Sequence, residues 1–154
     1  MTATKQRLRT HVRWCIRRDC PEVLRIDTDS FPDPWSEDDF LRHLRRRNCI
    51  AMVAEYGDRV VGFMVYELEA DHLTVARLAV APECRGRGVG RQLVDKLVGK
   101  LSSHRRTRLE LVARESNLGG HLFLRACGFR AETVEPDWYE DTGEDGYAFA
   151  FRLA

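Results

Sequence analysis

Residues 78–101, LAVAPECRGRGVGRQLVDKLVGKL, decide the fold class of this chain. An apolar run typical of a strand ends at Pro82, and a turn that contains three glycines follows it. From Leu93 onward, apolar residues recur at spacings of three and four, which predicts an amphipathic helix. Residues 107–114, TRLELVAR, then return to the composition of a strand. This succession of strand, glycine-rich turn, helix and strand predicts a β-α-β unit and hence an α/β fold.

The segments on either side continue the mixture of strands and helices. A hairpin signal centred on Gly57 predicts two antiparallel strands in the first half of the chain. Asp19 and Ser36 are the expected N-caps of two helices before that hairpin, and Gly128 is the expected stop of a last helix. The expected strands lie in residues 10–17, 49–69 (two strands), 72–80, 107–114 and 146–154, and the four expected helices in residues 19–31, 36–47, 89–103 and 116–128.

Length, composition and charge favour one domain without a broad electrostatic partner. The 154 residues are 44% hydrophobic, which suffices for a core, and no low-complexity linker divides them. We therefore predict a single domain over residues 1–154, with residues 1–10 as a loose N-terminal extension. The formal net charge is only +1, so neither DNA nor a membrane surface is an expected partner.

Cysteine, histidine and hydropathy patterns disfavour several other classes. The five cysteines contain no C-x-x-C pair and the histidines share no ligand spacing, so we expect neither a disulfide framework nor a bound metal. No apolar run approaches the roughly 18 residues of a membrane span. The first ten residues lack the apolar segment of a signal peptide. These patterns predict a cytoplasmic protein.

The glycine-rich turn itself has two interpretations. Glycines between a strand and a helix let backbone N–H groups converge on a phosphate at the positive end of the helix, and Arg85, Arg87 and Arg91 add charge. The same residues also suit a tight turn with solvated arginines. The spacing matches neither G-x-x-x-x-G-K-[ST] nor G-x-G-x-x-G, which disfavours a P-loop or a dinucleotide-binding fold.

Within this turn, Arg85, Gly88 and Gly90 form the pattern R-x-x-G-x-G. The pattern resembles the acetyl-coenzyme A motif of the GCN5-related N-acetyltransferase (GNAT) family. Residues 78–94 are similar to the strand-to-helix segment of that family, and residues 115–129, ESNLGGHLFLRACGF, resemble its later segment that begins with SN and ends with GF.

Two further segments resemble one branch of the family, the enzymes that acetylate protein N-termini. They are FPDPWSEDDF at 31–40 and DWYEDTGEDGYAF at 137–149. The bacterial ribosomal-protein alanine N-acetyltransferases are typical of this branch. Together the similar segments span roughly residues 12–153.

The resemblance implies a single-domain GNAT fold and acetyl-CoA as cofactor. In that fold a mixed, mostly antiparallel sheet has two central parallel strands that splay apart, and pantetheine bonds to a strand edge in the gap. By the resemblance, residues 78–80 form this strand edge. The backbone of residues 85–90 would hold the pyrophosphate. Simpler alternatives are core positions for Leu78 and Val80 and a helix cap for Asn117. The expected cofactor-binding residues are Leu78, Ala79, Val80, Arg85, Gly86, Arg87, Gly88, Val89, Gly90 and Asn117.

The expected catalytic positions depart from the family. Alignment on SN and GF places Val112 where the branch has a glutamate base, and Leu124 where it has a tyrosine acid. Neither side chain can transfer a proton. Glu110 lies two residues before Val112, hence on the same strand face, and could act as the base through a bridging water. An exposed strand carboxylate without a catalytic role is the alternative for Glu110.

Physical chemistry limits the cost of these replacements. An α-amine has a pKa of about 8, so a useful fraction is neutral at pH 7, whereas a lysine amine with a pKa of about 10.4 is almost wholly protonated. A general acid or base contributes about 10² to 10⁴ in rate, while positioning contributes up to about 7–11 kcal/mol. Backbone donors near Val80 could in addition stabilise the thioester oxyanion. An N-terminal amine is therefore the substrate that needs the missing base least.

The stretch EPDWYEDTGEDGY at 135–147 is the expected acceptor site. It holds six carboxylates, which would attract an amine-bearing substrate. By the resemblance, Tyr139 matches a tyrosine that holds the first backbone amide of the substrate. A solvated acidic hairpin is the alternative. The basic end of the second helix, at residues 42–47, is better explained as a solvated helix C-terminus than as a contact for ribosomal RNA.

The leading hypothesis is therefore an N-acetyltransferase that moves acetyl from acetyl-CoA to a primary amine by direct attack in a ternary complex. The expected acceptor is the α-amine of a peptide, ribosomal protein or other protein, with Glu110 and Tyr139 as catalytic candidates. Two alternatives remain open at this point: a non-catalytic acyl-CoA-binding module, motivated by Val112 and Leu124, and transfer to a polyamine or aminoglycoside drawn by the acidic hairpin.

Overall fold

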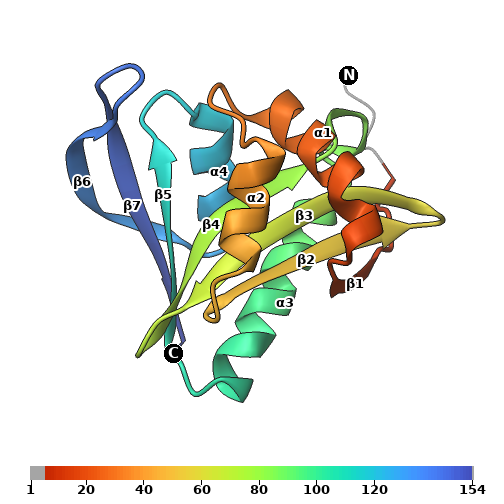
Figure 1. Ribbon diagram of the computed structural model, residues 1–154. Helices are drawn as coiled ribbons and strands as arrows, with labels where there is room; N and C mark the ends of the chain where they lie inside the picture. Colours follow the sequence, from red (N-terminus) through yellow and green to blue (C-terminus); the bar gives the residue numbers. More distant parts are fainter. Residues whose placement is uncertain (1–5, 154) are drawn as a thin grey trace. The chain divides into compact units, whose positions relative to one another are not determined.

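The computed structural model describes residues 6–153 and contains a mixed sheet with the strand order β1-β2-β3-β4-β5-β7-β6 (Figure 1). This architecture confirms the predicted α/β class with a mostly antiparallel sheet, and four α-helices lie within the described range. The strands are β1 (His11–Trp14), β2 (Cys49–Tyr56), β3 (Arg59–Leu68), β4 (His72–Val80), β5 (Arg108–Arg114), β6 (Arg130–Tyr139) and β7 (Glu144–Arg152). The helices are α1 (Cys20–Ser30), α2 (Glu37–Leu44), α3 (Val89–Ser103) and α4 (Leu118–Ala126).

The chain forms two compact units, of which the first comprises residues up to Glu67 and Ala76–Lys96. In this unit β2 pairs antiparallel with β1 and β3, and Gly57 provides the left-handed residue of the β2–β3 turn, with a φ of 61°. Figure 1 shows α1 and α2 in front of β2 and β3. A side chain at Gly62 would stand 3.0 Å from Val89 and 3.2 Å from the Ala79 carbonyl oxygen, so glycine permits close packing there.

The second unit comprises Leu68–Val75 and the chain from Leu97 onward. The start of β4 pairs in parallel with β5 over three residues of each strand, from His72 opposite Arg108 to Thr74 opposite Glu110. β7 lies between β5 and β6 and pairs antiparallel with both. β6 was not among the expected strands, because most of its residues are exposed and polar and give no alternating pattern. Its pairing with β7 creates the strand.

Cap contacts explain why the helices begin where they do. Ser36 Oγ accepts from the Asp39 N–H at 3.1 Å, and Asp39 Oδ2 accepts from the Ser36 N–H at 3.0 Å, which is a capping box. Asn117 Oδ1 caps α4 by accepting from the Gly120 N–H. Asp19 occupies the N-cap position of α1, as predicted, but its side chain makes no cap hydrogen bond to the helix. Its carboxylate accepts from the Ile16 N–H and from Arg13 instead, and this hydrogen-bonded ion pair holds the Asp19 pKa below its ordinary value.

The N-terminal residues differ from the loose extension predicted for residues 1–10. Residues 1–5 lie outside the described range, but Leu8 is buried and its N–H donates to the Arg87 carbonyl at 2.9 Å. Thr10 donates to Gln92 Oε1 from both its N–H and its hydroxyl. Residues 6–10 are therefore held against the start of α3. Whether residues 1–154 form one independently folding domain stays a prediction.

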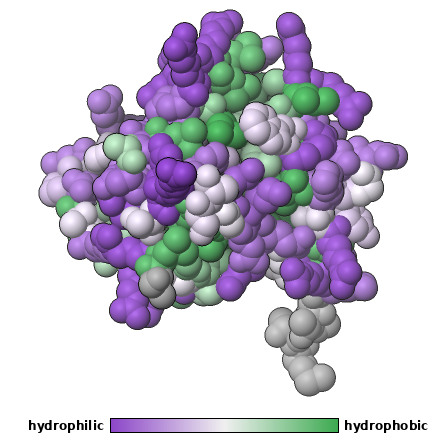
Figure 2. All heavy atoms as spheres, turned by 90° about the horizontal axis from the view of Figure 1, so that it is seen from below, coloured by the Kyte–Doolittle hydropathy of each residue, from purple (hydrophilic) through white to green (hydrophobic). Residues whose placement is uncertain are grey.

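Polar side chains dominate the face of the molecule that Figure 2 shows. In Figure 2, charged and polar side chains cover most of the visible face, and apolar side chains emerge between them in separate areas. Among the described residues, no helix is long and apolar enough to cross a membrane. The cytoplasmic location stays a prediction.

Candidate active site

The glycine-rich turn, residues 85–90, connects β4 to α3 and has the backbone geometry of an anion-binding loop. Gly86 and Gly88 have φ angles of 74° and 84°, which a residue with a Cβ adopts only with strain. α3 begins at Val89, so the first N–H groups of the helix lie at the end of this turn. The backbone can therefore present several donors to one anion, as the phosphate interpretation of the sequence requires.

The arginine side chains of this turn are engaged by the protein. Arg85 donates from Nε to the Val80 carbonyl at 3.0 Å and from Nη2 to Ser30 Oγ at 2.9 Å. Arg91 Nε lies 3.4 Å from the Asp95 carboxylate. The two Arg85 contacts join the turn to the end of β4 and the end of α1, whereas the Arg91–Asp95 pair lies within α3. The backbone, rather than the side chain of Arg85, is thus the part of the turn best placed to receive a ligand.

The predicted strand edge lies at the end of β4. Ala79 is buried, while Leu78 and Val80 are only partly buried, so a purely internal role for these two residues is wrong. The Ala81 N–H donates to the Val61 carbonyl at 2.8 Å and is not a donor for an oxyanion.

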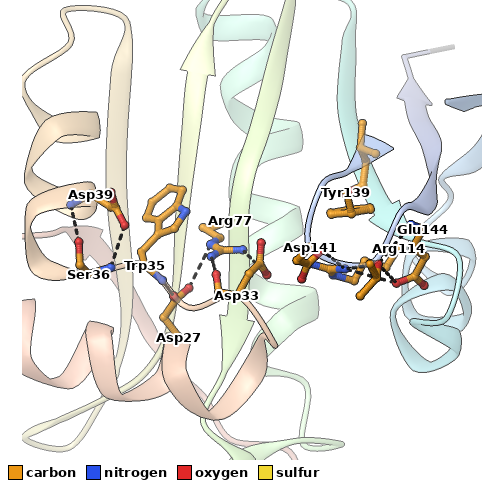
Figure 3. Close-up of polar contacts among 12 residues, drawn as sticks. Asp27, Asp33, Trp35, Ser36, Asp39, Arg77, Arg114, Tyr139, Asp141 and Glu144 are labelled. Carbon is orange, nitrogen blue, oxygen red and sulfur yellow. Dashed lines mark hydrogen bonds and ion pairs between the residues drawn. The ribbon is translucent and has the colours of Figure 1, made fainter. Parts of the chain in front are cut away.

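Arg77, on β4 directly before that edge, organises the segment between α1 and α2 (Figure 3). Its Nε lies 3.1 Å from Oδ1 of Asp27, which is 1% exposed, and its Nη2 donates to the Asp33 carbonyl. The guanidinium lies 4.2 Å from the Phe31 ring centroid and 4.7 Å from that of Trp35. One charged group thereby pairs with Asp27 of α1 and holds residues 31–35 by a hydrogen bond and two cation–π contacts.

Asp27 is the buried partner in this arrangement. Its Oδ2 accepts from the Trp35 N–H, and Arg77 faces its Oδ1. Burial raises the Asp27 pKa above its ordinary value, although the hydrogen bond from Trp35 and the charge of Arg77 oppose that shift. The contacts that favour the ionised form of Asp27 against burial are therefore those with Arg77 and the Trp35 N–H.

In the second unit, Arg114 organises the β6–β7 hairpin in a similar way (Figure 3). Its Nη1 and Nη2 donate to the two Asp141 oxygens at 3.1 and 2.9 Å, and Nη1 lies 3.3 Å from Glu144 Oε1. Its guanidinium lies 4.0 Å from the Tyr139 ring centroid. The hydrogen bond from Arg114 lowers the Asp141 pKa, and contacts with Ser116 and Arg114 lower that of Glu144. Two of the six predicted acceptor-site carboxylates are thus already paired.

Tyr139, at the end of β6, meets Val112 of β5. The Tyr139 hydroxyl lies 3.4 Å from the Val112 carbonyl oxygen and donates to it. Gly146 makes room for this arrangement, because a Cβ there would stand 2.6 Å from Val112 Cγ1 and 2.9 Å from Trp138. The hydroxyl that the sequence assigned to substrate binding therefore lies at the strand position where a base was expected and is missing.

Glu110 and Leu124 are placed differently. Both Glu110 oxygens have partners: Oε1 accepts from Arg108 Nε at 3.0 Å, and Oε2 lies 2.9 Å from His72 Nε2. Leu124 is buried in α4. Asn117 is a helix cap, as its alternative role predicted, and its exposed side chain uses Oδ1 for this bond. None of these observations tests a catalytic or cofactor role, and those assignments stay predictions.

Sequence reasoning missed the three residues that organise both segments, Asp27, Arg77 and Arg114. Asp27 interrupts the apolar face of α1 between Ile26 and a polar stretch, and an acid on a buried face is a signal that it has a cationic partner. Nothing in the sequence identified Arg77 as that partner, since it is 50 positions away.

A protein-family model described as the acetyltransferase (GNAT) family matches residues 20–129. The chain belongs to this family. As a GNAT protein it is an N-acetyltransferase, which confirms the resemblance noted in the sequence, and the family uses acetyl-CoA.

Two relatives and one solved structure are similar to this GNAT protein over most of its length. It is 28% identical to the [ribosomal protein bS18]-alanine N-acetyltransferase of Salmonella typhimurium over 79% of this chain and 81% of the relative. It is 30% identical to an uncharacterized N-acetyltransferase of Methanocaldococcus jannaschii over 87% and 86% of the two chains. The crystal structure of the ribosomal-protein-S18-alanine N-acetyltransferase from Escherichia coli superposes with a TM-score of 0.84 at 22% identity, over 95% of each chain.

Proposed function

We propose that this GNAT enzyme transfers acetyl from acetyl-CoA to the N-terminal α-amine of a protein or peptide, by direct attack in a ternary complex. The similarity to alanine N-acetyltransferases of ribosomal protein bS18 supports an N-terminal acceptor. The observation that carries the proposal within the structure is the Tyr139 hydroxyl, held at the Val112 carbonyl by a hairpin that Arg114 organises. A hydroxyl fixed in this way can accept a hydrogen bond from a peptide N–H.

The cofactor is assigned to the residues that the family resemblance indicated. The turn fits a pyrophosphate, because Gly86 and Gly88 let backbone N–H groups converge at the N-terminus of α3. The partly buried Leu78 and Val80 flank Ala79 at the strand edge assigned to pantetheine. Asn117, exposed beside α4, is the remaining contact. When bound, acetyl-CoA supplies a thioester whose carbonyl is the electrophile.

The proposed reaction depends on the neutral form of the substrate amine rather than on a strong general base in the enzyme. A peptide α-amine with a pKa of about 8 is neutral often enough at pH 7 to attack the thioester carbon. The amine nitrogen forms a bond to that carbon, the C–S bond breaks, and the amine loses one proton while the CoA thiolate gains one. Val112 and Leu124 can neither accept nor supply these protons. Glu110 would receive the amine proton through a water, in competition with its ion pair to Arg108 and its contact with His72.

The hairpin favours a peptide over a polyamine. Arg114 pairs with Asp141 and Glu144 and so offsets one of their two negative charges, and Asp145 accepts a hydrogen bond from the Asp137 N–H. The remaining negative charge is thus smaller and more dispersed than the composition of residues 135–147 suggests. A polycation gains most from a dense cluster of unpaired carboxylates, whereas one α-ammonium with a peptide backbone needs few charges and an oriented hydrogen-bonding group.

The test is release of CoA thiol from acetyl-CoA with peptides of varied N-termini, lysine peptides and polyamines as acceptors. The proposal expects turnover with α-amine peptides, little with the same peptides blocked at the N-terminus, and little with polyamines. Turnover confined to polyamines or to lysine side chains would refute it. Mass spectrometry of the peptide product locates the acetyl group and separates these outcomes.

Two substitutions test the residue assignments. Tyr139→Phe keeps the ring beneath Arg114 and removes only the hydroxyl, so the KM for peptide should rise while the KM for acetyl-CoA stays the same. Glu110→Gln should lower kcat by about 10², the contribution of a general base. Glu132→Gln is the matched control, because Glu132 is also a strand carboxylate paired with an arginine, Arg152. If the Glu110 and Glu132 variants behave alike, Glu110 is not the base.

A further inference from the structure

Residues 6–10, called the N-terminal arm below, form part of the wall of the phosphate turn. Leu8 pairs through its N–H with the Arg87 carbonyl at 2.9 Å, and Arg87 Nε donates to the Gln6 carbonyl at 2.9 Å. Gln92, in the first turns of α3, donates from Nε2 to the carbonyls of both Leu8 and Gly88. The arm and the turn therefore share hydrogen bonds on two sides. These hydrogen bonds hold the N-terminal arm and the glycine-rich turn in a fixed arrangement.

Arg7 lies where this arm meets the turn. A Cβ placed on Gly88 would stand 3.1 Å from Arg7 Cγ and 3.6 Å from both Cδ and Nε. The methylene stem of Arg7 therefore occupies the space that a side chain at position 88 would fill. Gly88 is constrained twice, by its φ of 84° and by this contact. The stem brings a guanidinium to the middle of the turn assigned to the pyrophosphate.

Arg7 differs from the neighbouring arginines in the partners of its guanidinium. Arg87 is bound to Gln6 and Arg91 to Asp95, and Arg85 bonds to Val80 and Ser30. Arg7 is exposed, and within residues 6–153 its guanidinium has no carboxylate or carbonyl partner. A positive group held by its stem, with its donors unused by residues 6–153, is suited to an anionic ligand.

We infer that Arg7 is a cofactor-binding residue, which closes the phosphate turn from the N-terminal side and donates to the pyrophosphate of acetyl-CoA. The inference rests on the proposed function, because it takes residues 85–90 as the phosphate site. It assigns to the arm a role in cofactor affinity that is separate from the chemistry of transfer. It also explains why the arm is fastened by Thr10 and Gln92 instead of extending into solvent.

Calorimetric titration of the full chain with CoA tests the inference without any acceptor. Arg7→Gln should raise the Kd for CoA by about five- to tenfold at low ionic strength, as expected for loss of one exposed charge-assisted hydrogen bond. The difference from the wild type should shrink as salt is added, since screening weakens exposed charge pairs. Arg7→Lys should restore most of the affinity because it keeps the charge and the stem.

Arg9→Gln is the matched control. Arg9 lies on the same arm, is exposed and carries the same charge, but Arg7 is the residue whose stem lies at Gly88. The loss in Arg7→Gln should exceed that in Arg9→Gln and should persist with 3′-dephospho-CoA, which retains the pyrophosphate. Equal losses in the two variants, or a loss that vanishes with 3′-dephospho-CoA, would overturn the inference. Failure of the wild type to bind CoA would instead refute the proposed function.

Discussion

The ion pair between Asp27 and Arg77 supports a quantitative prediction about stability. Arg77→Ala leaves a carboxylate that is 1% exposed without its charged partner. Removal of one partner of a buried pair costs about 3–5 kcal/mol. The contacts of the guanidinium with Phe31 and Trp35 are lost as well, so a value near the upper end of that range is expected for the loss in unfolding free energy.

A double-mutant cycle distinguishes this mechanism from a simple loss of packing. Asp27→Asn in the Arg77→Ala background removes the buried charge and retains an acceptor for the Trp35 N–H. The double variant should therefore be more stable than Arg77→Ala alone. Urea unfolding followed by tryptophan fluorescence measures all four proteins, and additive single effects would refute the argument.

The same pair predicts a pH dependence with a defined sign. Loss of Arg77 removes an interaction that lowers the Asp27 pKa, so that pKa, already raised by burial, should rise further. The folded variant then binds more protons than its unfolded state between the two pKa values, and its stability falls as the pH rises through that window. The deficit of Arg77→Ala relative to the wild type should thus be smaller at pH 4 than at pH 7. A deficit that does not change with pH would contradict an uncompensated Asp27 charge.

Three further predictions concern the turn, the hairpin and a helix cap. Gly86→Ala should cost about 1–2 kcal/mol of stability, because its backbone is left-handed, and should weaken acetyl-CoA binding in calorimetry. Gly57→Ala is the control: its backbone is also left-handed but it lies outside the glycine-rich turn, so it should lose stability without losing acetyl-CoA affinity. Arg114→Ala should raise the peptide KM with little change in the Kd for acetyl-CoA; equal effects on both would contradict a hairpin-specific role. Ser36→Ala should lower the unfolding free energy by about 1 kcal/mol in urea titrations, and an unchanged midpoint would show that the Ser36 cap is not stabilising.

Much of the fold was predictable because its signals are local. The glycine-rich turn required left-handed residues, and Gly86 and Gly88 adopt that conformation. Ser36 and Asn117 cap the helices that their positions predicted, since a cap depends on residues only three apart. β6 was missed because an exposed strand at the edge of a sheet buries neither face and leaves no periodic pattern.

The sequence by itself determined the order of strands and helices apart from β6, the glycine-rich turn and the family. Only the tertiary structure decided how the charged residues pair. It joins Asp27 to Arg77, sets Arg114 between two hairpin carboxylates, and fastens the N-terminal arm to Gln92, 82 positions away from Thr10. Hydrophobic periodicity indicates which face of a helix or strand is buried, and the spacing of apolar residues in the sequence is enough to show it. The partner of a charge depends on strand register and on how elements pack, which no local pattern encodes.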